Sequence, residues 1–418
     1  MKKLGFLMLG TAMALIVAAP APAAAQNNPN AAATQKVRKN RSATQRIAAS
    51  EHRRAHSFSD LGQEYSDLKD YLQKEYGIGY ALDISYMPQY GAPSGKKTAF
   101  QTMIYPSLTW ETFNNEYGTG TLNVAYNMVR YSGNNGENIG NRIGVVTGIN
   151  DYTSLSNSFD ELYYTYQLPG KWNWLTVALG QFPIYNFDGT AYDSNQQENF
   201  INFALSQNAS STYPTASMGG YIQISPNSEW SLAVGAQDAH NIDGDGISTS
   251  KLANNAHYTT FASLSYTPTI KGLGAGQYSV LLYNQPWEDV QAQTTNGWSL
   301  NASQELGEKF AVFGRINGVS GSVAEINQSY VLGAVYNNPL DRNPLDQIGF
   351  AAAYNKIDEA AVGEPLQHDA ETVLEAYWAW GISKWMTLTP DVQFYINPAL
   401  NPKSDHATVV SLRASVFF

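Results

Sequence analysis

The amino-acid sequence predicts an all-β protein: a transmembrane antiparallel β-barrel of about 16 strands, with a short N-terminal helical segment. The clearest sign lies in the last ten residues, where apolar and polar side chains alternate and the chain closes on an aromatic residue. The apolar positions are Val410, Leu412, Ala414, Val416 and Phe418, and Ser411, Arg413 and Ser415 lie between them. Such a strand suits lipid on one face and water on the other. The alternative is an amphipathic strand of a soluble sandwich.

The N-terminus supplies the second observation. Lys2 and Lys3 precede an apolar run over residues 4–19, and Ala23 and Ala25 frame an A-x-A cleavage site. This is the pattern of a secretory signal peptide, assigned to residues 1–25. No later stretch approaches the roughly 20 apolar residues that a spanning helix needs. The chain is therefore predicted to be exported, and any membrane crossing must be made by strands.

Residues 26–78 are predicted to form a periplasmic linker and a short helix ahead of the barrel at 79–418. The part up to residue 57 is polar and reads as a linker or a weak helix. Residues 58–76 place Leu61, Tyr65, Leu68 and Leu72 at helical spacing. Gly77 and Gly79 end this helix, which is expected beneath or inside the barrel mouth.

From residue 80 onward the apolar residues recur with a period of two. Four short turns place a charged residue and then an aromatic one ahead of an alternating strand, which predicts an aromatic girdle formed by Trp172, Trp230, Phe310 and Trp385. The predicted strands lie near 80–90, 99–113, 118–131, 158–168, 172–183, 215–225, 229–238, 257–268, 276–286, 296–305, 309–318, 328–337, 346–355, 371–382, 385–396 and 407–418. An even count leaves both termini in the periplasm, and the stretches 142–149 and 198–207 are assigned to outer loops.

Strand parity gives a set of inward-facing candidates for the pore lining. Charged residues are expensive on the lipid face, by about 2–4 kcal/mol for Arg or Lys at the midplane. Each inward residue therefore alternates with apolar or aromatic neighbours, as Arg413 does with Leu412. The candidates are Glu161, Tyr163, Arg315, Glu375, Tyr377, Asp391, Gln393, Tyr395 and Arg413.

The charge distribution is uneven. Residues 36–54 hold seven basic side chains and one acidic, and with Lys2 and Lys3 they contribute eight positive charges. Since the whole chain carries −10, the residues after 54 carry about −18. An acidic pore would disfavour anions and suit neutral or cationic solutes. The alternative places most of these carboxylates on exposed loops, where they serve solubility.

Two segments resemble a known family. They are "AYWAWGISKWMTLTPDVQFYINPALNP" (376–402) with the final strand, and "LKDYLQKEYGIGYALDISY" (68–86). Both resemble the carbohydrate-selective (OprB-like) porin family of Gram-negative bacteria. Membership would imply a sixteen-stranded monomeric or trimeric barrel in the cell outer membrane, surrounded by its lipid, that passes sugars down a gradient. The final strand also resembles the C-terminal signal that the barrel-assembly machinery recognises.

Signals of other chemistry are weak. Neither a G-x-S-x-G nor an H-E-x-x-H motif occurs, so no catalytic residue and no cofactor is predicted. The chain has no cysteine, and its six histidines show no metal-ligand spacing, so no metal site is predicted. The histidines are His52, His56, His240, His257, His368 and His406. The basic stretch 36–54 lacks interleaved aromatic residues, which argues against nucleic acid as a partner. A barrel-anchored enzyme or adhesin remains the alternative to a channel.

The longest predicted outer loop, residues 185–214, joins two strands that are clear in the sequence. A loop of this length is usually functional. It would either fold inward and narrow the channel, or cap the barrel rim from outside.

Overall fold

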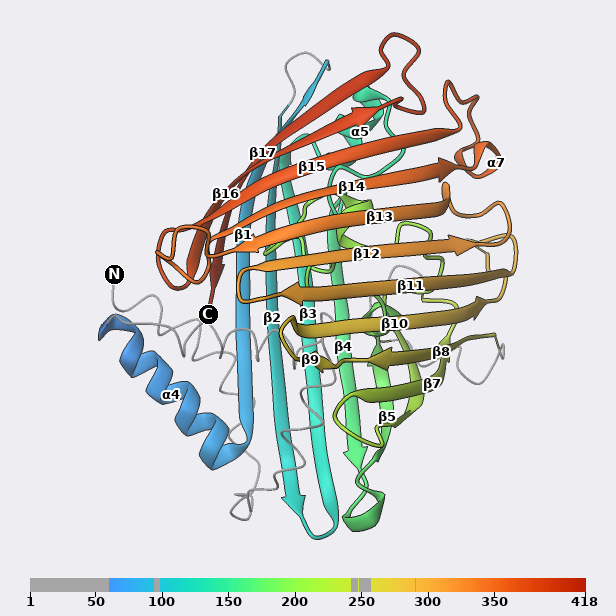
Figure 1. Cartoon of the computed structure of the whole chain (residues 1–418). Coiled ribbons are helices and arrows are strands. Elements are labelled where there is room, and N and C mark those ends of the chain that lie inside the picture. The colour runs from blue at the N-terminus through green and yellow to red at the C-terminus, as the bar shows by residue number, and fades with distance from the viewer. Residues whose placement is uncertain (1–59, 94–97, 242–246, 248–256, 290) are drawn as a thin grey trace.

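Sixteen long antiparallel strands close into one barrel, as the sequence predicted (Figure 1). The computed structural model describes residues 60–93, 98–241, 247, 257–289 and 291–418. The predicted signal peptide and linker lie outside the described residues. The barrel strands are β1 (Ile78–Ala92), β2 (Thr98–Asn115), β3 (Gly118–Gly133), β4 (Ser156–Gln167), β5 (Leu175–Phe182), β6 (Ser217–Ile224), β7 (Trp230–Asp238), β8 (Tyr258–Tyr266), β10 (Gly274–Gln285), β11 (Thr295–Leu306), β12 (Phe310–Val319), β13 (Ile326–Asn337), β14 (Gln347–Ile357), β15 (Ala370–Gly381), β16 (Met386–Ile396) and β17 (His406–Phe417).

Each strand pairs with its neighbours in the chain, and β1 closes the ring by pairing with both β2 and β17. Asp83, for example, lies opposite Tyr105 on one side and Phe417 on the other. The two-residue β9 (Thr269–Ile270) lies in the turn before β10 and does not add to the wall. The stretches 142–149 and 198–207 lie outside the strands, as expected; α5 (Gly136–Ile143) ends in the first of them, and α6 (Phe203–Ser206) lies in the second.

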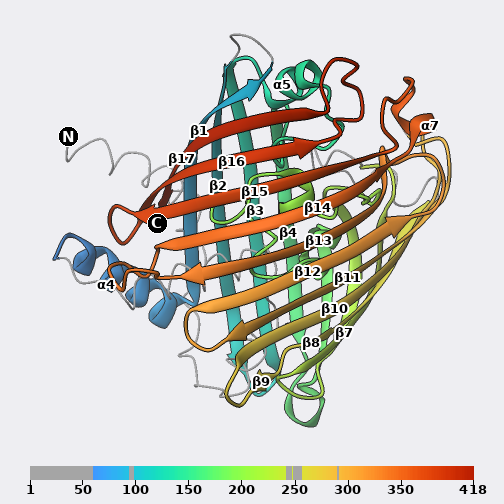
Figure 2. The same cartoon turned by 45° about the horizontal axis from the view of Figure 1, so that its top comes forward.

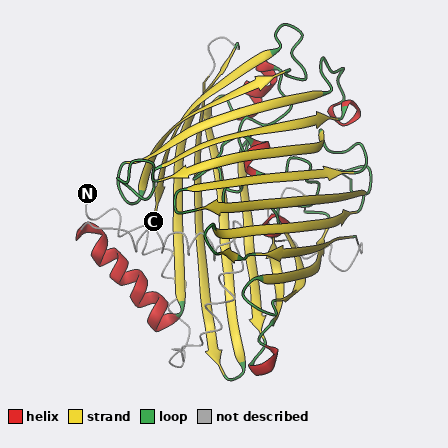
Figure 3. Cartoon of the chain, viewed as in Figure 1, coloured by secondary structure: helices red, strands yellow, loops and turns green. Residues whose placement is uncertain are grey.

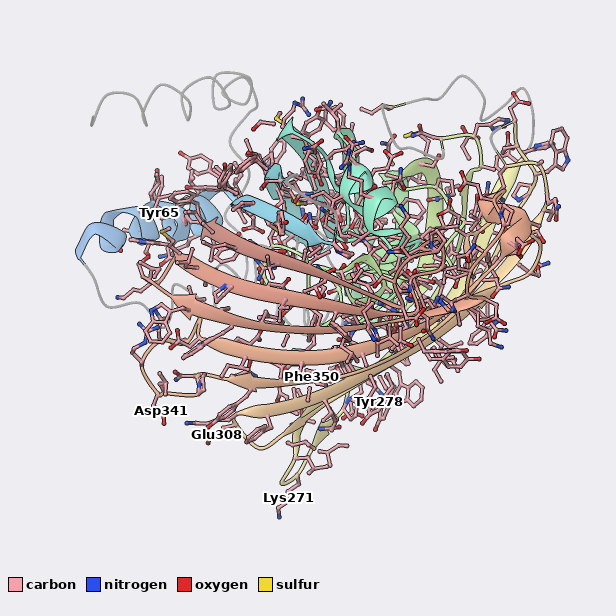
Figure 4. The ribbon with its side chains drawn as sticks, turned by 90° about the horizontal axis from the view of Figure 1, so that it is seen from above. Tyr65, Lys271, Tyr278, Glu308, Asp341 and Phe350 are labelled. Atoms are coloured by element: carbon pink, nitrogen blue, oxygen red, sulfur yellow. The ribbon has the colours of Figure 1, made fainter. Side chains whose placement is uncertain are left out.

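Exposure alternates along the strands with the predicted parity. On β17, Val410 and Leu412 are 46% and 43% exposed, whereas Arg413 is 1% exposed. The same alternation gives β14 an outward Phe350, which is 56% exposed (Figure 4). The barrel therefore turns an apolar surface outward and a polar one inward, which is the arrangement that suits a wall between lipid and water.

Short turns join the strands at the end of the barrel that also holds the start of β1 and the end of β17. Figure 4 labels one residue in each of three such turns, Lys271, Glu308 and Asp341. Beside these turns the predicted aromatic residues Trp172, Trp230 and Phe310 are exposed, and Trp385 is half-buried. The strand predicted from residue 172 begins at Leu175 instead, because the 3-10 turn η1 (Gly170–Trp172) precedes it.

The sequence left two placements open for helix α4 (Asp60–Tyr76), beneath or inside the barrel mouth, and the inner one is wrong: the helix lies outside the wall, next to the start of β1 (Figures 1 and 2). The Tyr65 ring meets Tyr80 at 6.2 Å and Phe418 at 6.4 Å, and both partners have the outward parity of their strands. Lys69 Nζ lies 4.7 Å from the centre of the Tyr80 ring. Aromatic packing on the outer face therefore holds the helix there.

Gly77 ends α4 and turns the chain into β1. Its φ is +67°, and a Cβ at this position would lie 2.6 Å from the carbonyl oxygen of Glu111. Only glycine fits such a turn without strain. None of the helices in the described part of the chain is long and apolar enough to cross a membrane.

Candidate functional site inside the barrel

Residues 183–216, between β5 and β6, fold into the barrel; we call them the inward loop. The loop leaves and rejoins the wall at one place, because Phe182 pairs with Ser217. Ile201 and Asn202, midway along it, are fully buried. Of the two placements that the sequence left open, the structure has the inward one. The loop lies within the ring of strands, in green in Figure 2, and Figure 3 shows that it is mostly irregular chain.

The first anchor of the inward loop is the Glu375 carboxylate on β15. It accepts backbone N–H groups from Ile201 at 2.5 Å and from Asn202 at 2.9 Å. The Asn202 amide in turn donates to Tyr395 Oη at 2.7 Å and to Gln393 Oε1 at 3.1 Å, both on β16. Carboxylate-to-backbone bonds of this kind are among the stronger hydrogen bonds in proteins. Three of the predicted candidates therefore hold the same two loop residues.

The second anchor is Arg413 on β17. Its guanidinium donates to the backbone carbonyl of Asn199 at 2.7 Å, to that of Glu198 at 3.1 Å and to that of Gln196. Asp391 on β16 interacts electrostatically with Arg413 and with Glu375. The planar fork of an arginine suits several carbonyl oxygens at once. The buried guanidinium of Arg413 therefore positions the backbone of the inward loop.

The third anchor is Arg315 on β12, which forms an ion pair with Asp193 of the inward loop at 3.2 Å. The two side chains are 1% and 0% exposed. Arg315 also donates to the Ala204 carbonyl at 2.8 Å. A buried charge that has both an opposite charge and hydrogen bonds is the arrangement in which such a pair is tolerated.

Asp188 of the inward loop connects two other parts of that loop and also binds the barrel wall. Its carboxylate accepts from Asn208 at 2.8 Å, from Tyr213 Oη at 3.2 Å and from Asn301 of β11 at 2.8 Å. Burial raises the pKa of the Tyr213 phenol well above its usual range, and the Asp188 charge adds to the shift. Tyr213 is therefore neutral and able to donate.

On β4 a bulge turns two consecutive carboxylates inward. The register to β3 shifts at this point, so both Asp160 and Glu161 are buried. Glu161 accepts the Asn186 amide at 2.7 Å, and Asp160 accepts the Tyr185 hydroxyl at 2.8 Å. A bulge places two residues opposite one and re-aims a side chain. Parity alone predicted Glu161 and missed Asp160.

Two of the three tyrosine candidates, Tyr163 and Tyr377, pack in aromatic clusters beneath the inward loop. Tyr163 lies 6.2 Å from Phe182 and 6.3 Å from Tyr221. Tyr377 meets Phe200 of the loop edge-on, with ring centres 4.9 Å apart. These rings contribute apolar contact area to the loop.

A second segment, residues 134–155 between β3 and β4, also folds inward; we call it the companion loop. Glu371 on β15 accepts its backbone N–H groups at Thr147, 2.5 Å, and Val146, 3.2 Å. The companion loop meets the inward loop where Phe203 N donates to the Gly148 carbonyl at 3.0 Å. Sequence reasoning missed Glu371. The signal was available, because Thr372 and Leu374 have outward parity and therefore place Glu371 on the inner face.

The structure places all nine predicted candidates on the inner face, each no more than 5% exposed. Most of their polar groups are bound to the inward loop, and their part in a solute path stays a prediction. The loop itself presents half-buried side chains that sequence reasoning did not single out. We call these the loop edge: Asn186, Phe187, Tyr192, Asn195 and Glu198.

Carboxylates outnumber cations inside the described barrel. Eight acidic side chains are buried on the inner face or in the inward loop, against Arg315 and Arg413. The eight are Asp83, Asp160, Glu161, Asp188, Asp193, Glu371, Glu375 and Asp391. The interior is therefore acidic, and the acidic character predicted from the sequence is not confined to exposed loops.

Asp193→Ala is expected to destabilise the folded barrel by about 3–5 kcal/mol, because it leaves Arg315 buried without its partner. The measurement is the free energy of unfolding from a urea titration in lipid vesicles. Asp341→Ala is the matched control, since it breaks the exposed Lys309–Asp341 pair, for which a loss of at most about 1 kcal/mol is expected. Equal losses in the two variants would contradict the anchoring role.

A closed sixteen-stranded antiparallel barrel with a loop folded into its lumen defines the porin class of outer-membrane channels. The chain belongs to the carbohydrate-selective porin, OprB family, whose model matches residues 101–418. It is an outer-membrane porin, as the resemblance of its first and last strands implied.

The relatives agree with this assignment. The chain is 39% identical to porin AaxA of Chlamydia felis, over 85% of this chain and 81% of that protein. It is 38% identical to porin AaxA of Chlamydia pneumoniae, over 87% of this chain and 84% of that one. Among solved structures, Pseudomonas putida OprB at high pH has a TM-score of 0.68 at 17% identity, covering 86% of this chain and 97% of that chain. That likeness shows the fold alone.

Proposed function

We propose that this porin passes small sugars and other small hydrophilic solutes by passive diffusion, with a weak preference for cations over anions. The loop edge carries the proposal, because it sets two aromatic rings, two amides and one carboxylate on the segment that folds into the barrel. Amides and carboxylates satisfy sugar hydroxyls, and aromatic rings cover the C–H faces. The family's description as carbohydrate-selective supports the same solutes.

The two rings of the loop edge are held in place by the barrel wall. Phe187 lies 4.9 Å from Phe261 and 5.1 Å from Tyr221. Tyr192 stacks on Phe313 with ring centres 6.4 Å apart. Burial raises the pKa of Tyr192 to about 12, so its hydroxyl stays neutral at physiological pH. Preorganised rings of this kind offer a fixed surface to a passing solute.

Liposome swelling with a graded panel of sugars tests the proposal. Vesicles holding the purified protein should swell in monosaccharides and more slowly in larger oligosaccharides. A barrel that passes neither sugars nor ions would favour the alternative, an enzyme or adhesin anchored by its barrel. The proposal holds for a monomer and for a homotrimer alike. It includes recognition of the final strand by the barrel-assembly machinery.

Glu198→Gln is expected to reduce the cation preference of the channel, because it removes a half-buried carboxylate from the loop edge while keeping the side chain's shape. The effect should be larger in about 0.01 M salt, where charges act over about 30 Å, than at physiological salt, where they act over about 8 Å. Reversal potentials in a salt gradient measure it. Glu364→Gln, on an exposed outer loop, should leave the potential unchanged; anion preference in the unmodified protein would overturn the charge argument.

A further inference from the structure

Two histidines and a glutamate that are far apart in the sequence meet at the long-loop end of the barrel. His240 follows the end of β7, His257 precedes β8, and Glu288 follows β10. One ligand atom from each of the three lies within 4.8 Å of the other two. The barrel register brings them together, which is why spacing along the chain gave no sign of a metal site. No residue of the inward loop takes part.

The contacts of this cluster are short and converge on Glu288. His240 Nε2 lies 3.2 Å from Glu288 Oε2, and His257 Nδ1 lies 2.9 Å from Glu288 Oε1. The two imidazole rings are stacked, with centres 5.7 Å apart. The Glu288 and His240 side chains are 7% and 8% exposed, whereas His257 is 32% exposed and has room to adjust.

Asp238 supports the cluster from behind. Its Oδ1 lies 2.5 Å from His240 Nδ1, where it can accept a hydrogen bond from Nδ1–H and leave Nε2 to face Glu288. A carboxylate behind a histidine is the usual arrangement around metal-bound imidazole, because it fixes the tautomer and raises the basicity of the ligand. Asp238 is 1% exposed, and its Oδ2 accepts no hydrogen bond from the described residues.

The two carboxylates around His240 favour a positive charge in this cluster. In the tautomer with the proton on Nδ1, Nε2 and the Glu288 oxygen face each other as two acceptors 3.2 Å apart, and either a second ring proton or a metal cation satisfies both. A divalent cation also balances the charges of the two carboxylates. Imidazole and carboxylate ligands suit Zn²⁺, which binds nitrogen and oxygen at about 2.0–2.2 Å. Small shifts of the side chains, chiefly of His257, bring the three ligand atoms to those distances.

We propose that His240, His257 and Glu288 bind a Zn²⁺ ion, with Asp238 as the positioning residue behind His240. The ion would tie together the outer ends of β7 and β8 and the chain after β10. Three protein ligands leave a fourth position for water. The proposal does not depend on the solute path proposed above, because it uses none of the residues assigned to that path.

Metal binding to tag-free protein in detergent tests the proposal. After incubation with Zn²⁺ and dialysis, elemental analysis should find one zinc per barrel, and Co²⁺ should give the visible absorption of a four-coordinate site. His257→Ala and Glu288→Gln should abolish both signals. Asp238→Asn should weaken the affinity by about 10–100-fold, the usual effect of losing such a partner.

Two controls separate this site from adventitious binding. His368→Ala removes a histidine at the same end of the barrel that lies beside a single carboxylate, Asp405, at 3.5 Å; it should leave zinc binding unchanged. His52→Ala with His56→Ala should also leave it unchanged. Zinc that persists in His257→Ala, or that is lost with His52 and His56, would overturn the proposal, as would the absence of bound zinc.

A second readout covers variants that fold poorly. The His257 ring meets Trp287 edge-on with centres 5.0 Å apart, so metal binding should change tryptophan fluorescence. Zinc should also raise the thermal unfolding temperature of the unmodified protein and of His368→Ala, but not that of His257→Ala, because a ligand that binds only the folded state stabilises it. Equal shifts in all three proteins would contradict the site.

Discussion

Replacing residues 187–212 of the inward loop by a short Gly-Ser turn is expected to raise the single-channel conductance severalfold. The pairing of Phe182 with Ser217 brings the ends of the loop together, so a short connection keeps the register of β5 and β6. The deletion removes the chain that fills the lumen beside β12, β15, β16 and β17. It also exposes Arg315, Glu375 and Arg413 to water, so no buried charge is left unpaired. The barrel should therefore fold and conduct more freely, and discriminate less among sugars.

Planar-bilayer recording measures the conductance, and swelling rates with large and small sugars measure the discrimination. The matched control is a deletion of residues 359–365, which include α7 (Glu359–Val362) and lie on the outer connection from β14 to β15. This segment is mostly exposed. The control should conduct as the unmodified protein does. An unchanged conductance in the loop deletion would mean that the inward loop does not limit flow.

The strands could be predicted from the sequence because each one separates lipid from a polar interior. This demand imposes a period of two that no other element has, and it fixes which residues face inward. Leu412 and Arg413 on β17 are the simplest case: neighbours in the chain with opposite parity and opposite exposure. Departures from the prediction occur where the backbone changes its path, as at η1 before β5 and at the bulge beside Asp160.

The inward loop could not be placed from the sequence, because much of its attachment is to backbone. Arg413 binds the carbonyl of Asn199, and Glu375 binds the N–H of Ile201, so the identity of the loop residue matters little to either bond. The cluster of His240, His257 and Glu288 was hidden for a different reason. His240 and His257 come together only through the register of β7 and β8.

Leu412→Arg is expected to block stable insertion of the barrel. Leu412 lies on the outer face of β17, pairs with Pro390 of β16 and is 43% exposed. A guanidinium there would face hydrocarbon, at a cost of about 2–4 kcal/mol near the midplane. The final strand also closes the ring against β1. A defect in it should therefore lower the yield of closed barrels as well as their stability.

The matched control is Leu340→Arg, in the short turn between β13 and β14, where the residue is 56% exposed. Near the interface an arginine costs about 0–1 kcal/mol, so this variant should insert normally. The folded fraction in lipid vesicles is measured by heat-modifiable electrophoretic migration, and stability by urea titration.

Arg413 sharpens the comparison, because one position further along the same strand an arginine is already present. It is accepted there because three carbonyl groups of the inward loop surround it, whereas lipid chains offer no acceptor to a guanidinium introduced in place of Leu412. Equal insertion of both variants would place Leu412 away from lipid and contradict the register of the final strand.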